Sequence, residues 1–171
     1  KGYDLLLAAL AALPSSLNWR LTHIGGGELS SPLSAQAQKL GIADRIEWRG
    51  ACDQSEVIAA LRAADVFVLA SRVARDGDRD GLPNVLMEAT SQELPIVATD
   101  VSAIPEFIEN GKHGVLVEPD AGKLSDALAE TICDPDGRAT MAKAARARLA
   151  AEFGMDRGIG KLATRLRAAL S

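Results

Sequence analysis

The sequence is poor in aromatic residues and in cysteine. Phenylalanine, tryptophan and tyrosine make up only 4% of its 171 residues, too few for the stacking platforms that bind single-stranded nucleic acid. We therefore predict no nucleic-acid partner. The core must consist of leucine, valine, isoleucine and alanine, as in domains whose helices pack closely on a sheet.

The two cysteines, Cys52 and Cys133, match neither a metal-binding spacing nor a disulfide framework. This usage is typical of a reducing cytoplasm, so we predict a cytoplasmic protein in which both thiols are small buried apolar groups. The sequence also lacks an apolar run of the ~18 residues that cross a bilayer. Any membrane contact is expected to be peripheral, at the inner face of the membrane.

Positive charge is concentrated near the end of the sequence, although the formal net charge is −4. Only two acidic residues follow Gly137, whereas eight residues there are basic: Arg138, Lys143, Arg146, Arg148, Arg157, Lys161, Arg165 and Arg167. Apolar residues between these charges favour an ordinary solvated helix face, and contact with anionic lipid is the alternative.

Short apolar strands alternate with helical segments along the sequence. Helices are predicted at residues 4–13, 28–40, 55–64, 83–91, 121–132, 137–152 and 156–170. Strands are predicted at residues 19–24, 46–48, 66–70, 96–99 and 114–117. This alternation predicts an α/β fold, a doubly wound Rossmann-like parallel sheet with helices on both faces, formed by residues 1–171 as one domain. The sequence opens on a helix, so the first strand of the sheet is expected upstream.

A glycine turn follows the first predicted strand. Gly25, Gly26 and Gly27 let the backbone approach a ligand closely, and the helix start behind them offers free amides to phosphate. The third glycine of a dinucleotide fingerprint is missing, because Ser30 occupies its place. Turn formation alone is the alternative reading of these glycines.

The run from Asp76 to Gly81 imitates the start of a calcium-binding loop. Such a loop needs a bidentate glutamate at its twelfth position, but Met87 stands there, and a strand rather than a helix precedes the run. We therefore predict no metal and no other cofactor.

A different chemistry is predicted for the run DGLPNVLMEA, residues 80–89. The helix start at Pro83 and Asn84 would offer unpaired amides to a diphosphate, and Glu88, on the same face as Asn84, could accept the protons of ribose hydroxyls. Asp80 would then reach the sugar. In the alternative reading, Asp80 only caps the helix and Glu88 is a surface residue.

The order of the motifs DGLPNVLMEA, LPIVATD, IPEFI and GVLVEPD resembles the C-terminal domain of retaining GT-B glycosyltransferases of family 4, the glycosyl transferases group 1. The upstream runs KGYDLLLAAL, WRLTHIGGGE, LGIADRIEWRG and LRAADVFVLAS match the same pattern, so the resemblance covers nearly the whole chain. It implies a nucleotide-sugar-binding half whose N-terminal acceptor domain is absent from residues 1–171.

The resemblance also implies roles for individual residues. Asp80 stands where the family usually has the first of two glutamates, and would contact the donor sugar or phosphate as the catalytic candidate, one methylene shorter than usual. The implied substrate-binding residues are Lys1, Gly25, Gly26, Gly81, Leu82, Pro83, Asn84 and Glu88. Lys1 would bind the diphosphate, with its partner arginine upstream. Glu93 and the pair Ser102-Ala103 stand where the family commonly has glycines, so both sites lose backbone freedom.

By this resemblance the whole enzyme is a hexosyltransferase. It would move a hexose from a UDP- or GDP-sugar, with retention of configuration, to a polysaccharide or lipid-linked acceptor, and this part alone would be inactive. Two other readings are open: a nucleotide-sugar-binding module without transfer activity, and a nucleotide-sugar epimerase on the same fold.

Overall fold

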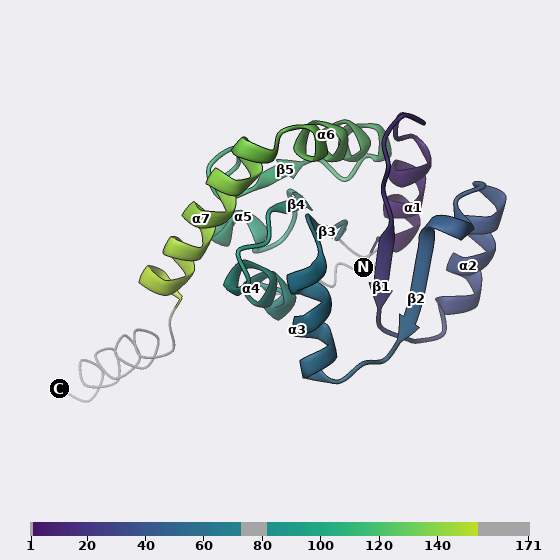
Figure 1. Ribbon diagram of the computed structural model, residues 1–171, viewed down its shortest axis with the longest axis horizontal. Helices are drawn as coiled ribbons and strands as arrows, with labels where there is room; N and C mark the ends of the chain where they lie inside the picture. Colours follow the sequence, from purple (N-terminus) through teal and green to yellow (C-terminus); the bar gives the residue numbers. More distant parts are fainter. Residues whose placement is uncertain (1, 73–81, 154–171) are drawn as a thin grey trace.

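The computed structural model describes residues 2–72 and 82–153 of the chain (Figure 1). Its strands are β1 (Leu21–Ile24), β2 (Ile46–Gly50), β3 (Phe67–Leu69), β4 (Ile96–Thr99) and β5 (Val115–Val117). Its helices are α1 (Tyr3–Ala11), α2 (Ser30–Lys39), the 3-10 turn η1 (Ala43–Arg45), α3 (Gln54–Ala63), α4 (Asn84–Ser91), α5 (Ile104–Phe107), α6 (Ala121–Cys133) and α7 (Pro135–Glu152). The alternation predicted from sequence is confirmed over these residues, and the helix predicted at 156–170 lies outside them.

All described strands pair in parallel, which confirms the predicted α/β class. They form two sheets, β1-β2 and β3-β4-β5, rather than one continuous sheet. Among the described strands, β1 pairs only with β2 and β3 pairs only with β4, so no hydrogen bonds join β1 to β3.

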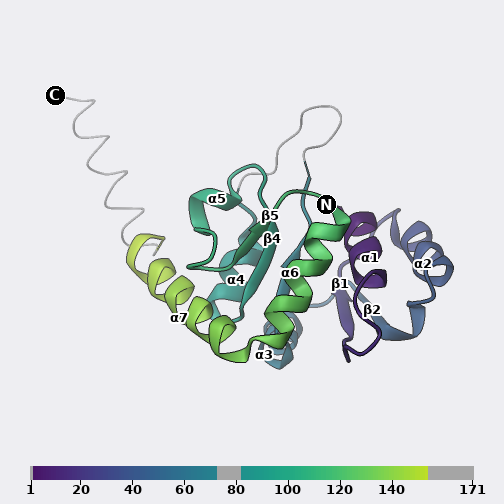
Figure 2. The ribbon, with the colours of Figure 1, turned by 90° about the horizontal axis from the view of Figure 1, so that it is seen from above.

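Helices cover both faces of the strands, as predicted (Figure 2). On one face, α1 and α6 pack together through leucines such as Leu7 and Leu124, in a cluster that includes residues of both sheets. On the other face, Leu86 of α4 and Phe107 of α5 pack on β3 and β4. β4 lies between these layers, and all four of its residues are buried. A strand covered on both faces is almost entirely apolar, as the residues Ile96–Thr99 are.

The prediction that both cysteines are buried was wrong. Cys133 is exposed and Cys52 is partly exposed. Residues 124, 127, 128 and 131 of α6 face the core at helical spacing. Cys133, two residues after the last of them, lies on the other side of the helix.

No helix in residues 2–72 and 82–153 is long and apolar enough to cross a membrane.

Candidate functional site

The glycine turn lies at the carboxyl end of β1. The backbone amide of Gly25 donates a 2.7 Å hydrogen bond to the carbonyl of Gly50, the last residue of β2, so the ends of both strands are joined. Gly25 and Gly27 have φ of 135° and 136°, which side chains rarely allow. At Gly26 an added Cβ would meet no atom within 4 Å, so the turn opens on free space. A ligand could therefore approach this backbone closely.

The helix behind the turn begins later than the sequence predicted. α2 starts at Ser30 rather than at Glu28, and its N-cap, Leu29, makes no side-chain capping bond. The hydroxyl of Ser30 instead donates to the carbonyl of Gly27 at 2.9 Å. Leu29 is 65% exposed beside the turn. The amide-rich segment is therefore the turn itself together with the uncapped start of α2.

Helix α4 carries the second group of predicted residues and follows β3, the first strand of the second sheet. Pro83 is the N-cap of α4 rather than its first helical residue, because its ψ of 125° is extended. The helix begins at Asn84, which is exposed, and no side chain caps it. Leu82 packs against the core with its side chain partly buried. The first-turn amides of α4 thus have no side-chain partner in the described part of the chain.

Glu88 lies one turn further along α4 and is half-buried. Its carboxylate oxygen Oε1 accepts a hydrogen bond from the side-chain amide of Gln54, the first residue of α3, at 3.5 Å. Gln54 follows β2 by four residues, just after the strand end that binds Gly25. A short path of contacts thus links the glycine turn to Glu88 along the carboxyl edge. Sequence reasoning missed Gln54, because only the fold brings residues 34 positions apart into contact.

The start of α1 lies at the same edge, beside the end of β3. A Cβ on Gly2 would stand 1.8 Å from the carbonyl oxygen of Ala70, so only glycine fits there. Asp4 forms an ion pair with Arg72. Burial raises the pKa of Asp4, but the hydrogen bond and charge of Arg72, with backbone amides, outweigh it and hold that pKa below its usual value.

The structure therefore gathers Gly25, Gly26, Pro83, Asn84 and Glu88 at the carboxyl edge of the parallel strands, where ligands of doubly wound folds bind. The predicted residues Lys1, Asp80 and Gly81 lie outside the described residues, as does the rejected calcium loop from Asp76.

Two residues at positions where the resemblance led us to expect glycine adopt a conformation that favours glycine. Glu93 and Ser102 both have φ of 55°, and they are the non-glycine residues with positive φ in the described ranges. Glu93 forms an ion pair with Arg146 of α7, whereas Ser102 is exposed. The predicted loss of backbone freedom thus becomes left-handed backbone strain at both sites.

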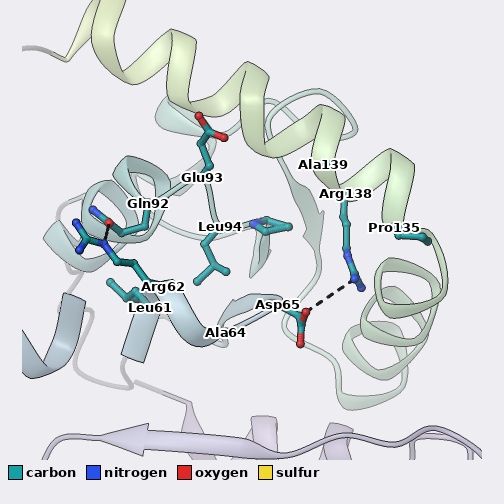
Figure 3. Close-up of a pocket in the computed structure, with 11 residues that line it drawn as sticks. Leu61, Arg62, Ala64, Asp65, Gln92, Glu93, Leu94, Pro135, Arg138 and Ala139 are labelled. Carbon is teal, nitrogen blue, oxygen red and sulfur yellow. Dashed lines mark hydrogen bonds and ion pairs between the residues drawn. The ribbon is translucent and has the colours of Figure 1, made fainter. Parts of the chain in front are cut away.

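Two open cavities lie away from the predicted site residues. One of about 400 Å³, at the amino ends of β3 and β4, is drawn in Figure 3. There Arg62 donates to Gln92 at 2.7 Å, and Arg138 lies 3.9 Å from Asp65. The other, of about 500 Å³, lies along β5 and α6. Of the predicted site residues that the structure describes, none lines either cavity.

Basic side chains of α7 are engaged within the protein. Arg138 and Arg146 pair with Asp65 and Glu93. Arg148 binds Glu152 at 3.3 Å, the backbone carbonyl of Glu106 at 3.0 Å and the ring nitrogen Nδ1 of His113 at 3.2 Å. These pairs reduce the charge that α7 can offer to an external surface, which favours the solvated-face reading for this helix.

The family model for glycosyl transferases group 1 matches residues 1–148. Over 170 residues the chain is 31% identical to a GDP-mannose-dependent alpha-(1-6)-phosphatidylinositol monomannoside mannosyltransferase of Mycobacterium tuberculosis, covering 98% of this chain and 44% of that protein. Over 156 residues it is 36% identical to a putative colanic acid biosynthesis glycosyltransferase of Salmonella typhimurium, covering 90% of this chain and 38% of that protein. The chain thus spans less than half the length of these relatives.

Among solved structures, the Anabaena protein HepE in complex with UDP and glucose superposes with a TM-score of 0.83 at 23% identity. The superposition covers 98% of this chain and 45% of that one. It establishes the shared half-domain fold of the GT-B architecture. With the family match over most of its length, this chain belongs to the glycosyl transferases group 1 family.

Proposed function

We propose that this chain binds the nucleotide-diphosphate-sugar donor of a retaining glycosyltransferase. The observation that supports the proposal is a set of contacts between the two regions: Gly25 bonds to Gly50 at the end of β2, and Gln54, four residues later, bonds to Glu88. A diphosphate suits the amides of the turn and of the uncapped start of α4, because helix starts carry partial positive charge. Ribose hydroxyls suit the carboxylate of Glu88, which is an acceptor only.

The catalytic demand of the proposed reaction is to stabilise negative charge on the departing diphosphate. In our proposal Lys1 and the helix-start amides supply this stabilisation, and Asp80 contacts the donor sugar or its phosphate. Gly81, Leu82 and Pro83 would shape the backbone between Asp80 and α4. The acceptor would bind to an N-terminal domain outside residues 1–171, so we expect no sugar transfer by this chain alone.

The relatives guide the choice of donor and acceptor. The mycobacterial relative is GDP-mannose-dependent and acts on a phosphatidylinositol mannoside, and the Anabaena protein binds UDP. We therefore propose a UDP- or GDP-hexose as donor and a polysaccharide or lipid-linked glycan as acceptor, handled at the cytoplasmic side. A binding module without transfer activity is the second candidate, because the chain spans only 44% of that relative.

Nucleotide titration during thermal unfolding tests donor binding. A ligand held at a hundred times its dissociation constant adds roughly 2.7 kcal/mol to the free energy of unfolding, which raises Tm by about 5 to 10 °C in a domain of this size. UDP, GDP and ADP should be compared under the same conditions. If none of the three raises Tm, the proposed donor site does not exist in this chain.

Glu88→Ala tests the proposed contact with ribose. Loss of a charge-assisted hydrogen bond should weaken nucleotide binding by about 1 to 3 kcal/mol, measured by calorimetry. Glu130→Ala is the matched control, because it removes the same charge from an exposed position on α6. Equal affinities of Glu88→Ala and the control would remove Glu88 from the site.

A further inference from the structure

The side chain of Gln54 connects α3 to α4, which no backbone hydrogen bond joins within the described residues. It starts from the first residue of α3, just beyond β2, and its Nε2 donates to Oε1 of Glu88 on α4 at 3.5 Å. In Figure 1 the two helices lie next to each other, and residues of one contact residues of the other. Gln54 is exposed, so this contact does not contribute to a buried core. At this length the bond is weak and adds little to the stability of the fold. We therefore consider its effect on the position of the Glu88 carboxylate.

The backbone of Gln54 is fixed by a complete capping box. The carboxylate of Asp53 accepts from the amide of Glu56 at 2.9 Å and from the hydroxyl of Ser55 at 2.7 Å. In return the carboxylate of Glu56 accepts from the amide of Asp53 at 3.0 Å. Reciprocal bonds of this kind stabilise the first turn of a helix. The amide group of Gln54 is therefore presented to α4 from a rigid base.

The contact leaves one oxygen of Glu88 available. Oε1 accepts from Gln54, and Oε2 has no hydrogen-bond partner in the described part of the chain. A free glutamate side chain samples several rotamers, and a ligand that needs one of them loses affinity in fixing it. A neighbour that restricts the carboxylate in advance reduces this cost.

We propose that Gln54 is a positioning residue, which holds Oε1 of Glu88 so that Oε2 faces the ribose hydroxyls of the donor nucleotide. The inference rests on the proposed donor-binding function. Gln54 itself touches no ligand in this scheme. Its effect on binding therefore passes entirely through Glu88 and depends on the ribose hydroxyls.

The test uses the whole chain and the nucleoside diphosphate, UDP or GDP, that the wild type binds. Gln54→Met keeps the length of the side chain but removes the donor group, and Gln38→Met is the control at an exposed position near the end of α2. Dissociation constants are measured for the nucleotide and for its 2′,3′-dideoxy form. We expect Gln54→Met to weaken binding of the ribonucleotide about 2- to 10-fold, to leave the dideoxy form unchanged, and to leave Tm without ligand unchanged.

Repeating Gln54→Met in the Glu88→Ala background completes the cycle. In that background we expect no further loss of affinity. A loss of the same size there would mean that Gln54 contacts the nucleotide directly, which overturns the positioning role. An equal loss for the ribo and dideoxy forms would overturn it too. If Glu88→Ala weakens binding and Gln54→Met does not, this inference fails while the proposed function stands. If the wild type binds neither nucleotide, the proposed function fails and the inference with it.

Discussion

Ser102→Gly should stabilise the protein, although it removes atoms. Ser102 follows β4 with φ of 55°, a left-handed conformation that costs a residue with a Cβ about 1 to 2 kcal/mol. Glycine avoids this cost but loses more entropy on folding, about 0.5 to 1 kcal/mol in regular structure. The serine side chain is exposed and makes no hydrogen bond in the described residues, so little else is lost. We expect a net gain of about 0.5 to 1 kcal/mol.

Chemical denaturation of the wild type and of two variants measures this gain. Ser102→Ala is the matched control, because it removes the hydroxyl but keeps the Cβ that causes the strain. Ser102→Gly should raise the free energy of unfolding and increase Tm by about 1 to 4 °C, given the usual scaling for domains of this size. The alanine variant should show no gain. Equal stability of the two variants would refute the assignment of strain to this backbone position.

Three further changes test other parts of the fold. Glu93→Gly removes the backbone strain of the same positive φ but also removes the ion pair with Arg146. It should therefore gain less stability than Ser102→Gly in the same denaturation assay. Gly2→Ala should destabilise by about 1 to 3 kcal/mol, because its Cβ would stand 1.8 Å from the carbonyl oxygen of Ala70; unchanged Tm would contradict this packing. Burial, with the charges of Arg148 and Lys112, lowers the pKa of His113 from 6.5, and burial lowers that of His23 too. The neutral forms of the two histidines therefore contribute fully to the free energy of unfolding above pH 6.5, the pKa in the unfolded chain. This contribution is lost as the pH falls through their lower pKa values in the folded protein. Urea unfolding at pH 7.5 and 5.5 should show this fall, and His113→Gln should reduce it.

Sequence periodicity predicted most of the elements, because each depends on residues close in the chain. The apolar run from Ile96 and the spacing of Leu124, Ala127 and Leu128 report burial directly. Periodicity missed α5, since the four residues from Ile104 to Phe107 are too few to show a helical repeat. Caps are also local, but the exact helix starts at Ser30 and Asn84 depend on backbone angles that the sequence does not determine.

The sequence predicted residues for the candidate site, and these stay a prediction, but it did not predict the contacts between them. Motif resemblance located Glu88 and the glycine turn, and the strand order implied that both lie at one edge. It could not reveal the bond from Gln54 to Glu88 or the bond from Gly25 to Gly50, which join residues far apart in the sequence. Resemblance did find the two strained positions, Glu93 and Ser102, because a position that favours glycine in a family commonly requires positive φ.

The described site residues line neither cavity, and this has a physical explanation. The glycine turn, the start of α4 and the Gln54–Glu88 pair form an open edge, and an edge becomes a cleft only when a second surface faces it. Hydrogen bonds at such an edge compete with water, which reduces their net contribution to binding. Exclusion of water strengthens them. In our proposal, the surface that excludes water from this edge belongs to the part of the enzyme that binds the acceptor. Donor affinity and acceptor binding should then be coupled, since both depend on closing the same edge.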